Sequence, residues 1–148
     1  MKKINEFSMK FLAKSNNESF ARSIVGVFAS QLDPTVDEIS DLKTAVSEAV
    51  TNCVVHAYGT KAYENKENMI DMHCVLYDSG IEVTIQDTGK GIEDVELARQ
   101  ALYTTAPESE RSGLGFTIME SFTDNITVTS KPDEGTKVTL LKLFKHLQ

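Results

Sequence analysis

Between Pro34 and Gly59 the chain contains neither proline nor glycine, and this uninterrupted stretch constrains the fold more than any other feature of the sequence. It opens with Thr35 three residues before Glu38, the S/T-x-x-E pattern of a capping box. At 1.5 Å per residue the stretch predicts a helix about 35 Å long, and Gly59 suits the position just after its end. Such a helix is as long as a small domain is wide, so both of its faces need a role.

One face of this predicted helix is apolar, and the other carries two polar side chains at helical spacing. The apolar stripe contains Ile39, Leu42, Val46, Val50 and Cys53. Glu48 and Asn52 stand four residues apart on roughly the opposite face. Taken alone, such a pair is typical of a solvated helix surface. Only the rest of the sequence can give it a chemical role.

The remainder of the chain predicts strands and shorter helices around this helix. Strand patterns occupy residues 3–13, 70–77, 81–85, 125–130 and 136–144, with the first at a sheet edge. A second capping-box pattern, Ser15 to Glu18, opens a helix over 17–31, and a short helix follows at 116–122. This order argues for an α/β fold, a two-layer α/β sandwich whose mixed, mainly antiparallel sheet is covered by helices on one face.

Length and composition limit the classes of function. With 148 residues, 41% hydrophobic and 25% charged, the chain is predicted to form one domain, 1–148. The net charge is −7 and the basic residues are scattered, which argues against nucleic-acid binding. With no apolar run of about 20 residues and no signal segment, we expect a cytoplasmic protein with no membrane contact. Cys53 and Cys74 lack metal-ligand spacing, so we expect buried free thiols.

Two glycine-containing loops are candidates for ligand binding. Asp87-Thr88-Gly89-Lys90-Gly91 places a carboxylate at a strand end, followed by glycines that let backbone approach a ligand. Arg111-Ser112-Gly113-Leu114-Gly115 ends at a predicted helix start, where N–H groups favour phosphate. The charged segment 92–112 lacks clear periodicity and predicts a mobile lid. Each loop alone is a weak signal, because both patterns occur in ordinary turns.

The order of these parts carries more information than any one of them. A helix with Glu48 and Asn52, a strand-end DxGxG, a lid, a GxG at a helix start and a late Gly135-Thr136 resembles the N, G1 and G2 boxes of the GHKL ATPases. No Walker A, HRD or DFG motif is present in the sequence. Four segments look like the anti-sigma F factor family of serine-protein kinases, namely NESFAR at 17–22, EAVTN at 48–52, HAY at 56–58 and RSGLGFTIME at 111–120.

The resemblance implies a Bergerat-type ATP site with Mg²⁺. Glu48 is then the candidate base for an incoming serine hydroxyl, and Asn52 ligates the Mg²⁺ that bridges the ATP phosphates. Asp87 accepts from the adenine amine, with the late threonine assisting, and the first glycine pair admits the base. The second glycine pair cradles phosphate, with the arginine on its outer oxygens. The residues implied to contact ATP or ADP are Asn52, Asp87, Gly89, Gly91, Arg111, Gly113, Gly115 and Thr136.

The resemblance also implies protein partners. Members of the family bind the sporulation sigma factor F, hold it inactive, and phosphorylate a serine on an anti-anti-sigma factor. Arg22 matches a position that faces partners, although an exposed, solvated arginine is the plainer interpretation. The strand-like N-terminus predicts a homodimer, in which it pairs across a two-fold axis. His56 lies one turn beyond Asn52, but a histidine near a helix C-terminus more often meets the dipole, and it is not counted as catalytic.

Several alternatives stay open. A stress-response anti-sigma B kinase shares these motifs. A nucleotide-gated sequestrator of a sigma factor with little kinase activity would keep the ATP site without the transfer. The catalytic domain of a sensor histidine kinase needs a dimerisation helix for which the chain has no room. A GHKL ATPase that drives motion carries further domains.

Overall fold

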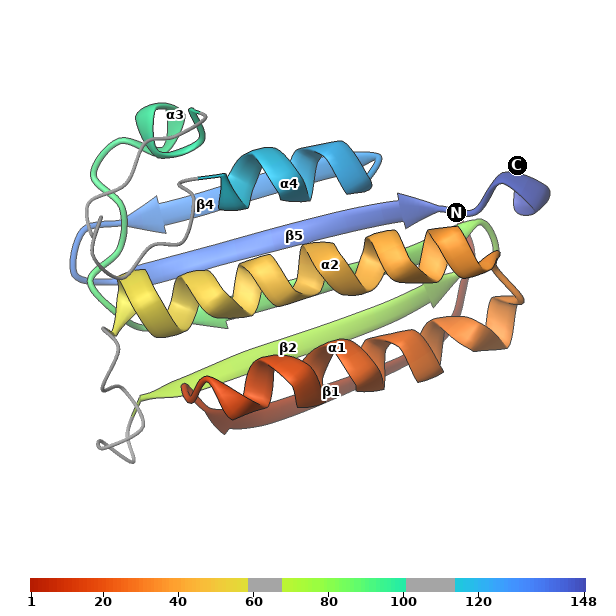
Figure 1. Ribbon diagram of the computed structural model, residues 1–148, viewed down its shortest axis with the longest axis horizontal. Coiled ribbons are helices and arrows are strands. Elements are labelled where there is room, and N and C mark those ends of the chain that lie inside the picture. The colour runs from red at the N-terminus through yellow and green to blue at the C-terminus, as the bar shows by residue number, and fades with distance from the viewer. Residues whose placement is uncertain (59–67, 101–113) are drawn as a thin grey trace.

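Three helices form one layer over one face of a five-stranded sheet (Figure 1) in the computed structural model, which describes residues 1–58, 68–100 and 114–148. The strands are β1 (Lys3–Leu12), β2 (Met69–Tyr77), β3 (Gly80–Asp87), β4 (Asn125–Lys131) and β5 (Gly135–Leu143). The helices are α1 (Asn16–Ala29), α2 (Val36–Asn52), the short α3 (Val95–Ala98) and α4 (Gly115–Phe122). Helical turns of other types occur at Ser30–Leu32, Cys53–Ala57 and Lys145–Leu147. The predicted two-layer α/β sandwich is confirmed.

The strand order is β1-β2-β3-β5-β4, and every pairing among the described strands is antiparallel. The sheet is therefore not mixed in the part of the chain that the structure describes. β1 lies at an edge, as predicted, and β4 forms the other edge. In the β2–β3 hairpin Tyr77 pairs with Gly80 beside the turn and Ile70 pairs with Asp87 at the far end. Asp87 therefore leaves the sheet at the end opposite the turn.

The core lies between the sheet and α2, the central helix of the layer. Leu42, Val46 and Val50 of the predicted stripe are fully buried. They pack with the inward residues of β2, where the predicted alternation Ile70, Met72, Cys74, Leu76 is also buried. Burying one such side chain contributes about 1.5–3 kcal/mol, so this seam fixes the helix on the sheet. Both cysteines are free and buried, and no helix within 1–58, 68–100 and 114–148 is long and apolar enough to cross a bilayer.

The two predicted capping boxes have different outcomes. At α2 the box is present, since the Glu38 N–H donates to Thr35 Oγ1 at 3.1 Å and the Thr35 N–H donates to Glu38 Oε1 at 3.0 Å. At α1 the predicted box is wrong. Ser15 already has helical angles, φ −53 and ψ −38, and makes no side-chain cap. Glu18 instead pairs with Arg22 one turn further on, at 2.5 Å.

The predicted helix to Gly59 also needs a correction. Regular α-helix ends at Asn52, and a π-helical turn from Cys53 to Ala57 follows, closed by a 3.2 Å bond from the Tyr58 N–H to the Cys53 carbonyl. The Ala57 carbonyl accepts from the Lys90 N–H of a distant loop at 3.1 Å, so it is not available to continue the helix. Gly59 itself lies outside the described residues. Single π turns of this kind occur frequently at functional sites.

Glu38 joins the start of α2 to the end of the chain. Its side chain is 8% exposed, and Oε2 accepts from the Lys145 N–H at 3.0 Å. Burial opposes ionisation of this carboxyl, but the hydrogen bonds from Thr35 and Lys145 outweigh burial and hold its pKa below the usual 4.5. One ionised carboxylate thus satisfies two backbone donors that are far apart in the sequence, the N–H groups of Thr35 and Lys145.

Replacing Glu38 by alanine is expected to lower the free energy of unfolding by about 1–3 kcal/mol, because a cap and a buried acceptor are lost together. A lowered folded-state pKa means that this stabilisation is fully present above pH 4.5 and disappears as the pH falls through the folded-state value. Urea unfolding at fixed protein concentration, at neutral and acidic pH, measures both effects. Asp37→Ala, at an exposed position one residue away, is the matched control. Equal losses in the two variants would contradict the prediction.

Candidate functional site

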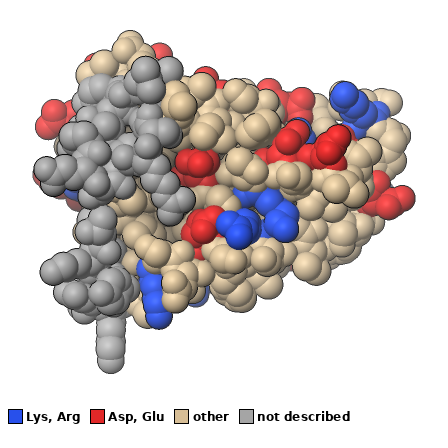
Figure 2. Space-filling model, in the orientation of Figure 1, with Lys and Arg blue, Asp and Glu red and all other residues tan. Residues whose placement is uncertain are grey.

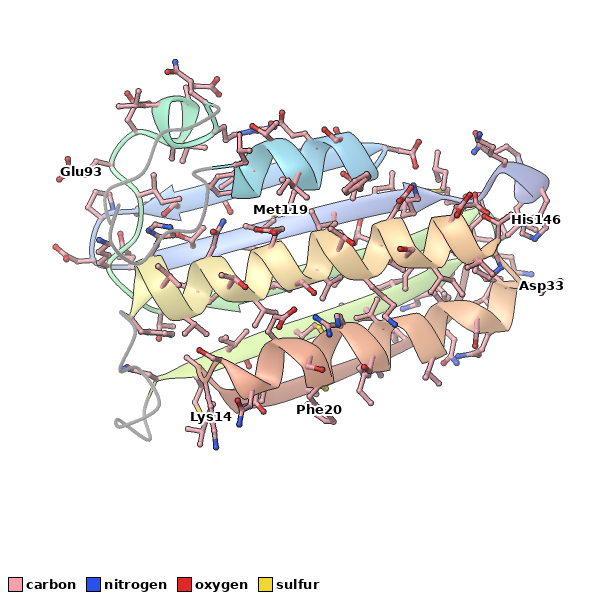
Figure 3. The ribbon with its side chains drawn as sticks, viewed as in Figure 1. Lys14, Phe20, Asp33, Glu93, Met119 and His146 are labelled. Carbon is pink, nitrogen blue, oxygen red and sulfur yellow. The ribbon has the colours of Figure 1, made fainter. Side chains whose placement is uncertain are left out.

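Four segments meet at one end of the molecule: the end of α2, the end of β3, the start of α4 and the turn between β4 and β5 (Figure 1). A cavity of about 460 Å³ lies between them, a size typical of small-ligand sites. Glu93, which lines it, stands at this end of the ribbon, whereas Asp33 and His146 mark the opposite end (Figure 3). Of the predicted site residues, the cavity is lined by Asn52, Asp87, Gly91, Gly115 and Thr136.

The start of α4 covers the polar face of α2. A methyl group placed on Gly115 would lie 3.1 Å from Asn52 Oδ1 and 3.5 Å from Glu48 Oε2. Both polar side chains are half-buried. The face that in isolation looks like a solvated surface is therefore an interface with another helix, and only glycine fits there without pressing on the Asn52 amide. Glu48, Asn52 and Gly115 lie together in the structure, and of the three Asn52 and Gly115 line the cavity.

Asp87 is a buried carboxylate held by donors from three segments. Its Oδ1 accepts from the Gly89 N–H at 3.0 Å and from the Thr136 N–H at 3.2 Å, and its carboxylate also hydrogen-bonds the Cys53 thiol. Asp87 is 5% exposed. Burial raises its pKa, and these hydrogen bonds offset part of the effect. The same burial and the neighbouring carboxylate raise the pKa of the Cys53 thiol well above its usual value.

The glycines of the Asp87 loop pack closely against neighbouring backbone. A methyl group on Gly89 would lie 2.4 Å from the Ala57 carbonyl oxygen. On Gly91, where φ is +74, it would lie 2.0 Å from the Lys131 carbonyl oxygen. The loop thus packs backbone to backbone against the π turn and the end of β4. Gly91 lines the cavity, whereas Gly89 is not among its lining residues and packs against Ala57.

Comparison with known proteins bears directly on this site. The model of the histidine kinase-like ATPase domain family matches residues 11–142. An anti-sigma F factor from Caldanaerobacter subterraneus is 54% identical over 138 residues, 93% of each chain. One from Clostridium acetobutylicum is 51% identical over 144 residues, 97% of each chain.

The chain belongs to the anti-sigma F factor family. A solved structure of the RsbU and RsbW domains of a Mycobacterium tuberculosis protein matches with a TM-score of 0.65 at 18% identity, over 95% of this chain and 33% of that one. At that identity the match shows the fold, which is the one predicted. The ATPase domain of the family implies that the chain binds a nucleotide.

Several predicted features of this anti-sigma F factor family member cannot be placed. Arg111 and Gly113 lie outside the described residues, as does the lid from residue 101 onward. The described start of that segment contains the short helix α3. His56 lines the cavity beside Asn52. Arg22 lies on α1, away from the cavity, with its side chain 39% exposed and paired to Glu18.

Residues that could hold a metal ion are limited to single oxygen donors. Within the described residues no group of three His, Cys, Asp or Glu side chains is arranged to hold a cation. Mg²⁺ at a phosphate site needs only one or two protein oxygens, since the phosphates and water complete its shell. The amide oxygen of Asn52, beside Gly115, fits that requirement.

Tyr58 is a site residue that the sequence did not reveal. Its hydroxyl accepts from the Thr88 N–H at 2.7 Å and donates to the Met69 carbonyl at 2.9 Å. It therefore fastens the loop after Asp87 to the start of β2. The only signal in the sequence is its place in the HAY segment, which gives no hint of the contact.

Tyr58→Phe is expected to loosen the Asp87 loop, because the exposed Thr88 N–H exchanges its protein acceptor for water at a cost of about 0.5–1.5 kcal/mol. Amide hydrogen exchange at Thr88 should accelerate and ADP affinity should fall by up to about tenfold. Tyr77→Phe, at the other end of β2, is the control and should leave both unchanged. Unaltered exchange at Thr88 in Tyr58→Phe would show that the hydroxyl does not hold the loop.

Proposed function

We propose that this chain is an ATP-dependent serine kinase that phosphorylates an anti-anti-sigma factor and also binds and inhibits sigma factor F. The observation that carries the proposal is one cavity lined by a buried acceptor, Asp87, and by Asn52 and Gly115, where the start of α4 meets the polar face of α2 that also carries Glu48. This arrangement suits a nucleotide, because the base needs a hydrogen-bond acceptor whereas the phosphates need N–H donors and a metal ligand. Residues 1–148 act as a single ATP-binding domain, supported by one sheet and one core.

At the base end, Asp87 accepts from the adenine amine. Its carboxylate has about four acceptor positions, of which the two amides and the thiol use three, so one remains for a ligand. Thr136 assists through its backbone, since its N–H holds Oδ1 and its hydroxyl bonds Ser130. Gly91 and Gly89 give the loop the shape that leaves room for the base.

At the phosphate end, the start of α4 meets the polar face of α2. The first N–H groups of α4 have no intrahelical acceptor, and the N-cap residue, Leu114, gives no side-chain cap. Gly115 and Gly113 cradle phosphate there, and Arg111 contacts the outer oxygens. Asn52 holds the Mg²⁺, which neutralises phosphate charge when bound. ATP and ADP are both ligands of the site.

Glu48 is proposed as the catalytic base. It lies one helical turn before Asn52 on the same face, and a methyl group placed on Gly115 would lie 3.5 Å from its Oε2 and 3.1 Å from Asn52 Oδ1. It takes the proton from the serine hydroxyl as the serine oxygen bonds to the γ-phosphorus. The bond from that phosphorus to the β,γ-bridging oxygen breaks, so the products are phosphoserine and ADP.

Partner proteins bind on the helical layer in this proposal. Arg22 lies on α1. One turn further along this helix, Gly26 leaves space for the aliphatic part of the Lys43 side chain from α2, whose Cδ would lie 3.1 Å from a methyl group placed on Gly26. Figure 2 shows basic side chains gathered at the seam between α1 and α2, next to acidic ones. Arg22 is thus a basic residue one turn from the contact of Lys43 with Gly26, on a chain of net charge −7. A sigma factor is a cytoplasmic partner, so we place the protein in the cytoplasm.

Two alternatives remain within the family. A stress-response anti-sigma B kinase would use the same site with another sigma factor. A nucleotide-gated sequestrator with little kinase activity would bind ATP and a sigma factor without transferring phosphate. The half-buried Glu48 beside Asn52 favours the kinase, because sequestration alone has no use for a base there.

Glu48→Ala should lower phosphate transfer from γ-labelled ATP to the serine of an anti-anti-sigma factor by about 10²–10⁴-fold, because general-base catalysis is lost. ATP affinity should change less than about threefold, because the carboxylate is not a nucleotide ligand in this proposal. The measurement is label on the partner protein with Mg²⁺ present, together with calorimetric ATP binding.

Two further variants separate the outcomes of that experiment. Asp87→Asn should lose ATP binding, and Arg22→Glu should keep ATP binding but lose binding of the partner. ATP bound by the wild type without any transfer would reject the kinase and leave the sequestrator.

A homodimer is proposed through β1. It is an edge strand, and Ile4, at the irregularity in its pairing with β2, is 55% exposed. Light scattering at tens of micromolar should give about twice the chain mass of 16.4 kDa. Ile4→Lys should shift the protein toward monomer, because a charge on an edge strand opposes pairing. Leu97→Lys, on α3 beside the other edge, is the control. A wild-type monomer would exclude the dimer.

A further inference from the structure

The short helix α3 supplies one wall of the cavity, and the start of α4 supplies another. Leu97 and Ala98 line the cavity from α3, and Gly115 and Phe116 line it from α4. None of the four residues of α3 is buried, and the apolar side chain of Leu97 is 36% exposed. The hydrophobic core therefore does not fix α3 as it fixes α2, and the position of this wall depends on contacts at its two ends.

The two ends of this wall are held by bonds of different kinds. Before α3, the Ile92 N–H donates to Ser130 Oγ of β4 at 2.8 Å. Directly after α3, Arg99 Nε and Nη2 both donate to Glu120 Oε1 of α4, at 2.8 Å and 2.5 Å. The Arg99 and Glu120 side chains are 26% and 41% exposed, so water reaches this ion pair and competes for both groups.

The ion pair joins the α3 wall directly to the helix that supplies the other wall. An exposed ion pair usually adds little to global stability, because water screens its charges. Its effect is expected instead on the local opening of an element that has few buried contacts, and α3 is such an element. When the pair opens, α3 is left with the Ile92 bond to β4, and the space between Leu97 and Phe116 can widen.

We infer that Arg99 and Glu120 are positioning residues that form a latch between the two walls, and that this latch sets how long a bound nucleotide stays in the cavity. The inference rests on the proposed nucleotide function and adds to it a determinant of the dissociation rate. Neither residue lines the cavity, so the latch acts through the wall residues of α3 and α4 and not by touching the nucleotide.

Release of the fluorescent analogue methylanthraniloyl-ADP measures the latch. Its displacement by excess ADP, with Mg²⁺ at low salt, is followed by stopped flow in the wild type, in Arg99→Glu and in Glu120→Arg. Each single reversal should speed release about three- to tenfold, because an attraction becomes a repulsion between like charges. The double variant Arg99→Glu/Glu120→Arg restores an opposite pair and should return the rate to within about twofold of the wild type.

Amide hydrogen exchange in the nucleotide-free protein measures the same latch without a ligand. The Leu97 N–H bonds Asp94 Oδ1 at 3.1 Å, and the Ala98 N–H bonds the Asp94 carbonyl at 3.0 Å. Exchange at both amides should accelerate in each single reversal and recover in the double variant.

Lys142→Glu is the matched control, because it breaks another ion pair between two elements, with Asp41 of α2 at 3.7 Å, and neither residue lines the cavity. It should change neither release nor exchange. Wild-type release in both single reversals, a double variant as fast as the single ones, or equally fast release in Lys142→Glu would each overturn the inference. A wild type that does not bind the analogue would reject the proposed function, whereas unchanged exchange at Leu97 and Ala98 would still reject the latch.

Discussion

The buried carboxylate of Asp87 is the interaction on which the rest of the site depends. A charge removed from water costs several kcal/mol unless hydrogen bonds replace the lost hydration. Here the replacements come from the loop through Gly89, from β5 through Thr136 and from the end of α2 through Cys53. Each of these hydrogen bonds lowers the pKa of Asp87 and so offsets part of the effect of burial. One side chain therefore ties a sheet, a loop and a helix end together at the mouth of the cavity.

The second constraint is that α2 is covered on both of its faces. Its apolar stripe packs on the sheet, while Gly115 allows α4 to approach Asn52 and Glu48. A larger residue at Gly115 would separate the helices at the point where the proposed phosphate site requires contact. The regular helix ends directly after Asn52, so the polar pair stands where the helix meets the loop that carries Asp87. Helix α2 therefore connects the proposed phosphate site to the loop that carries Asp87.

Much of this arrangement could be predicted from local patterns. Alternation over 70–77 predicted β2, and the box at Thr35 predicted the start of α2, because both depend on neighbours in the sequence. The failures depend on distant contacts. The box at Ser15 needs an extended backbone that the entry from β1 does not give, and the π turn reflects the bond from Lys90 to Ala57. The residues of the proposed site were chosen through family order and spacing. Tyr58 and Cys53 were not, because only the folded chain brings them to the Asp87 loop.

The acidic net charge of the chain does not by itself prevent the binding of a polyanion. Charges more than about 8–10 Å apart are largely screened at physiological salt, so only the local field counts. The cavity is lined by Glu93, Asp94 and Asp133 with a single lysine, Lys90, among the described residues. These carboxylates repel bare phosphate, and the start of α4 offsets only part of that repulsion. In the proposed function the cavity therefore binds a nucleotide together with its metal ion. Mg²⁺ neutralises phosphate charge that the lining carboxylates would otherwise repel, and Asn52 can ligate the ion directly.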